Sequence, residues 1–239
     1  MKRIHNRFAV VVAGALMLAQ AMFAQTSSDT QATIWRFDNI NSIGGHATHL
    51  FGHPYLINSP YGKAVEFNGI DDALLVDEHP LAGANAFTWE VIFRPDVDGA
   101  EAQRFFHLSE IDPATGKDTD NRMLFEIRIV KGEWCLDSFA ETNGSGRTLL
   151  NCNNLHPLGQ WYRVTAVYDG KTLRNYVGDA MQGESELHMA PQGAGHASIG
   201  TRINRRDFFK GAVFEARFTP RALSPEEFLE MPAVVSAEK

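Results

Sequence analysis

The chain has 239 residues, of which 44% are hydrophobic, and its formal net charge is −7 at pH 7. A β-sandwich of this length commonly forms one domain, and this share of apolar residues excludes disorder for the bulk of the chain. A net negative surface repels a phosphate backbone, so nucleic acid is not an expected partner. An acidic polysaccharide would need a local basic patch.

The first 24 residues resemble a secretory signal peptide. Lys2, Arg3 and Arg7 precede an apolar run over 8–18 and small residues near the expected cleavage sites, after Ala21 or Ala24. The alternative, an uncleaved anchor, would need about 20 apolar residues. Removal of three of the 22 basic residues leaves 19 against 29 acidic ones, a net charge of −10. We expect a periplasmic or extracellular protein that is not membrane-embedded, with one domain over 30–232 and a flexible tail over 233–239.

Alternation of apolar and polar side chains predicts an all-β fold. In Phe87–Arg94 the odd positions are apolar, and Glu90 and Arg94 lie on the opposite side of the strand. In Met123–Val130 the odd positions are again apolar, and Glu126 and Arg128 lie opposite. Further strands are expected at 34–37, 64–67, 73–76, 103–108, 133–141, 147–153, 162–168, 173–177, 198–203 and 212–218. Gly and Pro between them favour an antiparallel two-sheet jelly-roll sandwich.

The two cysteines lie in an expected hairpin. Strands 133–141 and 147–153 flank Asn143-Gly144, a strong hairpin signal. If these two residues form the turn, paired residue numbers add to 287, which places Cys135 opposite Cys152 (135 + 152 = 287) at a close, non-hydrogen-bonded pair. In an exported chain this predicts a disulfide. Two buried thiols, or a longer turn with another register, are the alternatives.

One short helix is expected near the C-terminus. Ser224 precedes Pro225, and Glu227 follows at the third helical position, a pattern typical of a helix start. Met231-Pro232 should end it. We expect this helix to cover one end of the sandwich.

Three phrases, in order, resemble a known family. They are Ala64-Val-Glu-Phe-Asn-Gly-Ile-Asp-Asp72, Trp161-Tyr-Arg-Val-Thr-Ala-Val-Tyr-Asp-Gly170 and the segment 211–227, Gly-Ala-Val-Phe-Glu-Ala-Arg-Phe-Thr-Pro-Arg-Ala-Leu-Ser-Pro-Glu-Glu. Their order and spacing are similar to those of the laminin-G-like, concanavalin A-like lectin and glucanase jelly rolls of secreted bacterial proteins. The resemblance implies the sandwich fold. It leaves the ligand open, because this fold carries lectins, adhesins, enzymes and spacers.

No catalytic residues are expected. The resembled glucanases carry Glu-x-Asp-x-(x-)Glu on one strand, and this motif is missing. Glu90 and Glu126, from separate strands, are the remaining pair that might flank a glycosidic bond. Pairing with Arg94 and Arg128 is the simpler role for both. Glu184-Ser-Glu186 lies in an expected turn.

No metal site is predicted, although a structural Ca²⁺ remains an expectation of the resemblance. His46, His49 and His53 lie in a Gly-rich, loop-like stretch without the fixed spacing of a zinc site. Related jelly rolls often bind Ca²⁺ through an Asp in the last strand, and Phe214 occupies that position. Asp38 and the turns 96–99 and 118–121 offer other oxygen ligands.

The expected ligand-binding face is dense in arginine and carboxylate. We assign to it Glu90, Arg94, Glu126, Arg128 and Asp137. Such a face suits bidentate hydrogen bonding to sugar hydroxyls or to a carboxylate, and a solvated face with cross-strand ion pairs is the alternative. Arg104 and His107 are expected on opposite faces of their strand, so only one of them joins the set.

These observations favour a secreted, non-catalytic binding module, and carbohydrate is the expected ligand. The alternatives are a polysaccharide-degrading enzyme on the same fold and a structural or cell-surface interaction domain. The expected partner is thus a glycan or a cell-surface protein.

Overall fold

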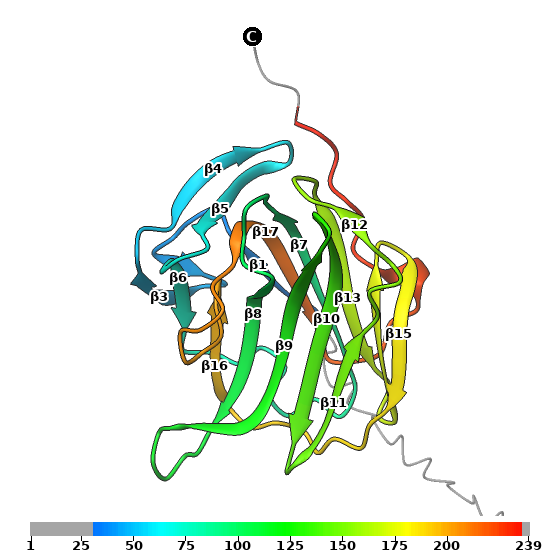
Figure 1. Ribbon diagram of the computed structural model, residues 1–239. Helices are drawn as coiled ribbons and strands as arrows, with labels where there is room; N and C mark the ends of the chain where they lie inside the picture. Colours follow the sequence, from blue (N-terminus) through cyan, green and yellow to red (C-terminus); the bar gives the residue numbers. More distant parts are fainter. Residues whose placement is uncertain (1–30, 236–239) are drawn as a thin grey trace, which may run out of the picture.

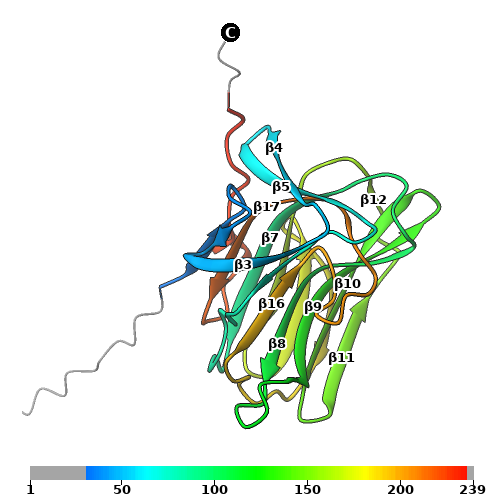
Figure 2. The ribbon, with the colours of Figure 1, turned by 90° about the vertical axis from the view of Figure 1, so that its left-hand side faces the viewer.

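The computed structural model describes residues 31–235, which form two antiparallel sheets packed face to face (Figures 1 and 2). We call them the β7 sheet and the β9 sheet. The β7 sheet has the order β15-β14-β13-β7-β17-β5-β4, and β1 also pairs with β17. The β9 sheet has the order β11-β10-β9-β8-β16-β6-β3-β2, and β12 also pairs with β10. The expected antiparallel jelly-roll sandwich is therefore confirmed.

The strands of each sheet come from the whole length of the described chain. Those of the β7 sheet are β1 (Thr33–Arg36), β4 (Tyr55–Ser59), β5 (Gly62–Asn68), β7 (Phe87–Pro95), β13 (Tyr162–Tyr168), β14 (Thr172–Val177), β15 (Ala180–Glu186) and β17 (Lys210–Thr219). Those of the β9 sheet are β2 (Ser42–Ile43), β3 (His46–Phe51), β6 (Ala73–Val76), β8 (Ala102–Ile111), β9 (Asp118–Val130), β10 (Glu133–Thr142), β11 (Ser145–Leu150), β12 (His156–Pro157) and β16 (Gly195–Ile199).

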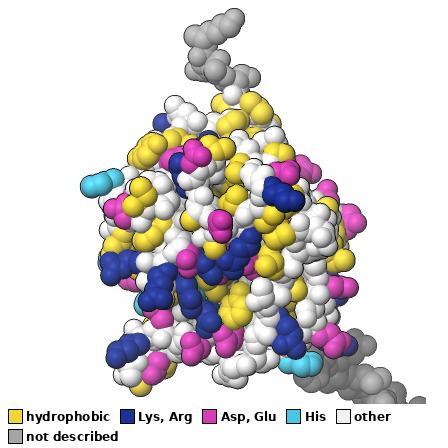
Figure 3. Space-filling model, in the orientation of Figure 1, with side chains coloured by type: hydrophobic (Ala, Val, Ile, Leu, Met, Phe, Trp, Pro, Cys, Tyr) yellow, Lys and Arg dark blue, Asp and Glu magenta, His cyan; other side chains and the backbone are white. Residues whose placement is uncertain are grey.

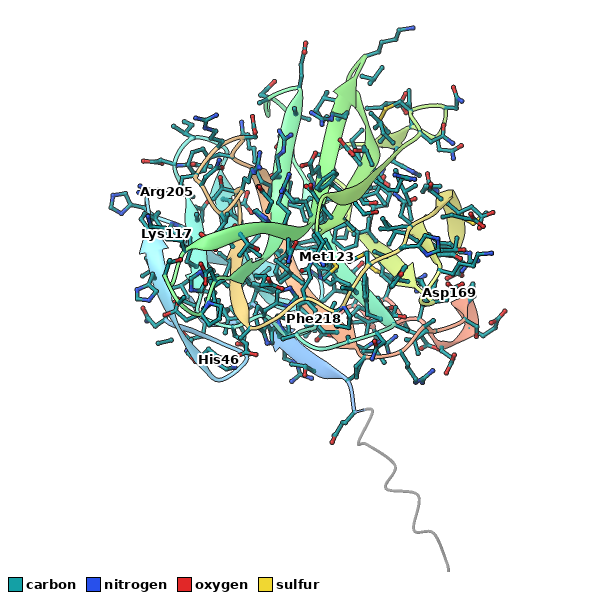
Figure 4. All side chains as sticks on the ribbon, turned by 90° about the horizontal axis from the view of Figure 1, so that it is seen from below. His46, Lys117, Met123, Asp169, Arg205 and Phe218 are labelled. Carbon is teal, nitrogen blue, oxygen red and sulfur yellow. A yellow bond between two sulfur atoms is a disulfide. The ribbon has the colours of Figure 1, made fainter. Side chains whose placement is uncertain are left out.

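The core lies between the sheets and is rich in aromatic rings. The odd-numbered apolar side chains of β7 and β9 lie there, as their alternation predicts, and all of them are buried except Ile129, which is partly buried. Phe93 stacks on Phe105 with 4.2 Å between ring centroids, and Trp89 lies 4.3 Å from Phe125. Figure 4, which views the molecule from below, labels Met123 of β9 and Phe218 of β17, two further core residues from opposite sheets.

Five strands were not expected: β2, β3, β4, β12 and β15. They lie toward the sheet edges or are very short, so their side chains alternate little between apolar and polar. The stretch that holds His46 and His49 is strand β3, and the expected turn at Glu184–Glu186 is the end of β15. Both expectations were wrong because pairing with distant or neighbouring strands, β2 and β6 for β3 and β14 for β15, forms these strands without a clear apolar alternation. β16 ends at Ile199 rather than at 203, since Gly200 turns the chain at a positive φ of 87°.

A β-bulge in β8 changes which side chains share a face. The register of β8 against β9 shifts between Arg104 and Phe106, so that Phe105 and Phe106 both enter the core. Arg104 then pairs with Glu126, and His107 pairs with Leu124. Arg104 and His107 therefore lie on the same outer face. The expectation that they lie on opposite faces was wrong, because a bulge inserts one residue into the alternation.

The cysteine hairpin has the predicted register. Paired positions of β10 and β11 run from Thr142 opposite Ser145 to Asp137 opposite Leu150. Asn143 and Gly144 have φ of 53° and 74°, the conformation of a type I′ turn. The Cys135–Cys152 disulfide is present, with 5.1 Å between the Cα atoms.

The C-terminal helix is one 3₁₀ turn, η1 (Pro225–Glu227). It lies over the outer face of the β7 sheet and not over an end of the sandwich. Apolar packing holds it there, because Phe228 packs on Val167 and Tyr176, and Leu223 belongs to the same buried cluster. Within 31–235 no helix is long and apolar enough to span a membrane. The expected signal peptide lies outside the described residues, as does the tail beyond 235.

Candidate functional site

The outer face of the β9 sheet contains a hollow of about 190 Å³. β8–β11 supply most of its lining, and the loop after β16 supplies Arg202. The lining residues are Arg104, Arg122, Leu124, Glu126, Arg128, Asp137, Phe139, Thr148 and Arg202. Figure 3 shows Lys and Arg side chains gathered on this face, with acidic side chains among them.

Strand register brings the charged residues of the hollow together. Residues directly opposite one another in an antiparallel pair share a face. Arg104 of β8 is opposite Glu126 of β9, which is opposite Asp137 of β10. Two residues along each strand, and so on the same face, Arg128 is opposite Cys135. The disulfide therefore ties the hairpin at the margin of this charged row.

Ion pairs join these side chains into one network. Arg104 Nε donates to Glu126 Oε1 at 2.8 Å, and Arg128 Nε donates to Asp137 Oδ2 at 2.8 Å. Arg128 Nη2 also donates to Glu126 Oε2 at 3.2 Å. The side chain of Asp137 is 1% exposed and that of Arg128 is 31% exposed. The carboxylates thus form the floor of the hollow, and the arginine reaches toward solvent.

The two floor carboxylates influence each other. Burial, together with the negative charge of Asp137, raises the pKa of Glu126 to about 7 although Arg104 opposes the shift. Oδ1 of Asp137 is buried and has no hydrogen-bond partner among the described residues. A proton on Glu126 would satisfy this oxygen.

The other half of the hollow is cationic. The Arg122 guanidinium lies over the Phe139 ring, 4.9 Å from its centroid, and its Nη1 lies 2.9 Å from Glu141 Oε2. Arg202 is half-buried, and its guanidinium makes no ion pair or hydrogen bond within residues 31–235. Burial and the positive charges of Arg122 and Arg104 lower the pKa of Arg202 from its usual value. It remains a cation at neutral pH.

The structure brings together three of the five residues assigned to the binding face. Glu126, Arg128 and Asp137 line the hollow. Glu90 and Arg94 lie on β7, whose outer face is on the opposite side of the sandwich. The five residues therefore do not form one surface.

Glu90 and Arg94 each have partners on their own face. The fully buried Glu90 carboxylate accepts the Leu229 backbone N–H at 2.6 Å and Arg217 Nε at 2.5 Å. Arg94 lies 3.0 Å from Glu66 and 2.6 Å from Asp96. Glu90 and Glu126, separated by the core, do not flank a common bond as a catalytic pair must.

The expected metal-ligand candidates lie apart. Within 31–235 no group of three or more His, Cys, Asp or Glu side chains is placed to hold a metal ion. His49 lies 3.2 Å from Asp77. Phe214, at the position of the family's calcium ligand, lies in a bulge of β17. Its ring packs against Tyr61 and Trp161, with 5.7 and 6.5 Å between centroids.

Sequence reasoning missed part of the lining: Arg122, Leu124, Phe139, Thr148 and Arg202. Two of these residues could have been found from the hairpin register, because the predicted pairing places Thr148 opposite Phe139. No local pattern indicates Arg202. Its place depends on the loop after β16, where the Arg104 backbone N–H donates to the Asp207 carbonyl at 2.8 Å.

Several solved structures have similar folds. Domain 4 of AbnA, a GH43 extracellular arabinanase from Geobacillus stearothermophilus, in complex with arabinotriose, matches at TM-score 0.60 and 18% identity, over 82% of this chain and 96% of that one. The binding domain of Paraclostridial Mosquitocidal Protein 1 matches at TM-score 0.60 and 11% identity, over 82% of this chain and 50% of that one. A heptameric SAP-like pentraxin from Limulus polyphemus matches at TM-score 0.54 and 17% identity, over 71% of this chain and 81% of that one.

These likenesses, at such low identity, show the fold alone. This chain spans half of the toxin domain. A search of the curated proteins finds no match. Residues 68–228, two thirds of the chain, match the family described as the Concanavalin A-like lectin/glucanases superfamily. The chain belongs to this superfamily.

Proposed function

We propose that the protein is a secreted, non-catalytic module that binds a carbohydrate in the hollow of the β9 sheet. The observation that carries this proposal is the charge network of the hollow, which keeps free hydrogen-bonding capacity. Arg128 is partly exposed, and the exposed Thr148 lies in the same hollow. Sugar hydroxyls both donate and accept, so they match a site that presents arginine donors beside carboxylate acceptors.

The half-buried Phe139 adds an apolar surface to the hollow. An aromatic ring beside a few placed polar groups is a usual composition for a ligand site. The arabinanase domain, solved with arabinotriose, gives a precedent for sugar binding on this fold. Its low identity transfers no residue to this chain.

Secretion is part of the proposal. The Cys135–Cys152 disulfide is consistent with an oxidising compartment. The sequence of the first 24 residues predicts export. Expression in a Gram-negative host, followed by N-terminal sequencing, should show loss of 21 or 24 residues, and an intact N-terminus in the membrane fraction would contradict this.

A glycan array with the mature protein tests the binding function. It should be run with and without EDTA, because a structural Ca²⁺ remains a prediction. Arg128→Gln should weaken binding, since glutamine keeps an N–H donor for Asp137 but loses the bidentate guanidinium. Arg174→Ala, on the outer face of the opposite sheet, is the matched control. Equal binding by the protein and by Arg128→Gln would place the ligand elsewhere.

A second candidate is a glycan-degrading enzyme. The observation in its favour is Glu126, whose raised pKa of about 7 suits a general acid and which is opposite Asp137. Both carboxylates are engaged by arginine, so we expect no hydrolysis of β-glucans or alginate. Turnover that disappears in Glu126→Gln would establish the enzyme instead.

A further inference from the structure

The cationic half of the hollow indicates a charged ligand. Three of its four arginines have a carboxylate partner: Arg104 pairs with Glu126, Arg128 with Asp137 and Arg122 with Glu141. Arg202 has no such partner in the described part of the chain, and the residue is partly exposed. A guanidinium that no carboxylate pairs and that solvent reaches is available to a bound anion.

The neighbours of Arg202 are further cations, which also favour a bound anion. The charges that oppose its ionisation most are those of Arg122 and Arg104, two further guanidiniums. An anion among them would interact favourably with all three. The net charge of −7 on the whole chain does not prevent this, because at physiological salt charges interact mainly within about 8 Å.

We infer that the ligand is an acidic polysaccharide, and that Arg202, beside Arg122, binds the carboxylate of one of its uronic acid residues. This inference rests on the proposed function and names the ligand class. A guanidinium matches a carboxylate in bidentate geometry. The hydroxyl of the exposed Thr148, in the same hollow, matches a sugar hydroxyl. A uronic acid carries both groups on one ring, whereas a neutral sugar leaves Arg202 unpaired.

The test compares matched ligands by calorimetry: trigalacturonate, an alginate trisaccharide, carboxyl-reduced trigalacturonate and a sulfated dextran oligosaccharide. We expect at least one of the two uronates to bind, at least tenfold tighter than the carboxyl-reduced sugar, and to bind less tightly as salt is raised. Arg202→Ala should remove most of that preference. Arg206→Ala, an exposed arginine of the same loop, is the control and should bind as the parent protein does.

The outcomes separate the two proposals. Binding of the carboxyl-reduced sugar as tightly as of the uronates, unchanged in Arg202→Ala, would overturn the uronate assignment and leave the carbohydrate function intact. Equal binding of the sulfated oligosaccharide would show a general anion site and would also overturn it. Failure to bind these probes, together with failure to bind any glycan on the array, would overturn both. Melting curves of each variant confirm that it is folded.

Discussion

Both outer faces of the sandwich carry arginine–carboxylate pairs, but the chain covers these pairs to different extents. On the β7 sheet, the segment that follows β17 crosses the face. Leu229 donates its backbone N–H to the buried Glu90, and Arg163 Nη1 donates to the Leu229 carbonyl at 2.7 Å. On the β9 sheet, the described chain leaves the hollow open. There, within residues 31–235, Arg202 makes no ion pair and Asp137 Oδ1 has no hydrogen-bond partner.

This difference separates structural charges from binding charges. Glu90 and Glu126 both alternate with core residues, and both contact an arginine. Only Glu90 is sealed by a segment of its own chain. A buried charge whose hydrogen bonds are completed within the fold is costly to unpair, whereas a charged group with unused capacity is available to a ligand. Each of the following experiments tests one side of this comparison.

The largest effect is expected for Glu90→Ala. The change leaves Arg217 without its carboxylate and the Leu229 N–H without its acceptor. Breaking one partner of a buried ion pair costs about 3–5 kcal/mol. For a domain of this size each kcal/mol corresponds to roughly 2–4 °C in Tm. Calorimetry should show the loss, while the folded variant still binds ligand. A change below about 1 kcal/mol would show that the covering segment is dispensable.

Next is removal of the disulfide by Cys135→Ser with Cys152→Ser. The bond joins residues separated by 17 positions, and the chain-entropy model gives roughly 3 kcal/mol, less where the hairpin ladder already holds the strands. Urea unfolding should show this loss. Mass spectrometry of the non-reduced, periplasmically made protein should find the linked peptides. Two freely alkylated thiols would contradict the bond.

Arg128→Gln and Arg94→Gln compare the two faces directly. Arg128 lines the hollow, so its change should weaken glycan binding about tenfold, which is about 1.4 kcal/mol. Arg94 lies in an ion cluster with Glu66 and Asp96 on the other face, so its change should lower Tm and leave affinity unaltered. Calorimetric titration and melting curves distinguish the two effects. Reversal of this pattern would place the site on the β7 sheet.

A pH series tests one carboxyl group on each face. Burial raises the pKa of Glu66 and of Glu126 from 4.5 to about 7. A raised folded-state pKa gives stability that is complete below the unfolded value and is lost as pH rises through the folded value. The contribution of these two groups to Tm should therefore fall between about pH 4.5 and 7, whereas the buried His79 and His107, whose pKa is lowered, contribute a slope of the opposite sign below about pH 6.5. Glu66→Gln and Glu126→Gln should each remove part of this fall, so that Tm declines less or rises more with pH than in the parent protein, and identical slopes in all three proteins would refute the shifts.

The smallest effect is expected for Arg174→Ala. Arg174 pairs with Asp169 and Glu184 on the exposed surface of the β7 sheet. Exposed pairs contribute about 0–1 kcal/mol, so stability should change little and affinity should not change. A fall in affinity would show that the ligand also reaches this sheet.

The sequence by itself determined the local part of this structure. Period-two alternation gave β7, β9 and their core-facing side chains, because successive side chains of a strand point to opposite faces. Turn chemistry at Asn143-Gly144 set the hairpin register and with it the Cys135–Cys152 bond. Three phrases indicated the family. Each of these patterns spans only a few neighbouring residues, so it can be recognised in the sequence without knowledge of the tertiary structure.

Tertiary structure decided which charges meet. Alternation assigns Glu90 and Glu126 to the outer side of their own strands and does not say to which sheet each strand belongs. The bulge at Phe105 placed Arg104 beside Glu126, and the loop after β16 added Arg202 from 98 positions further along the chain than Arg104. The segment after β17 covered Glu90. Each of these contacts depends on strand pairing or packing between distant segments, and no local pattern encodes it.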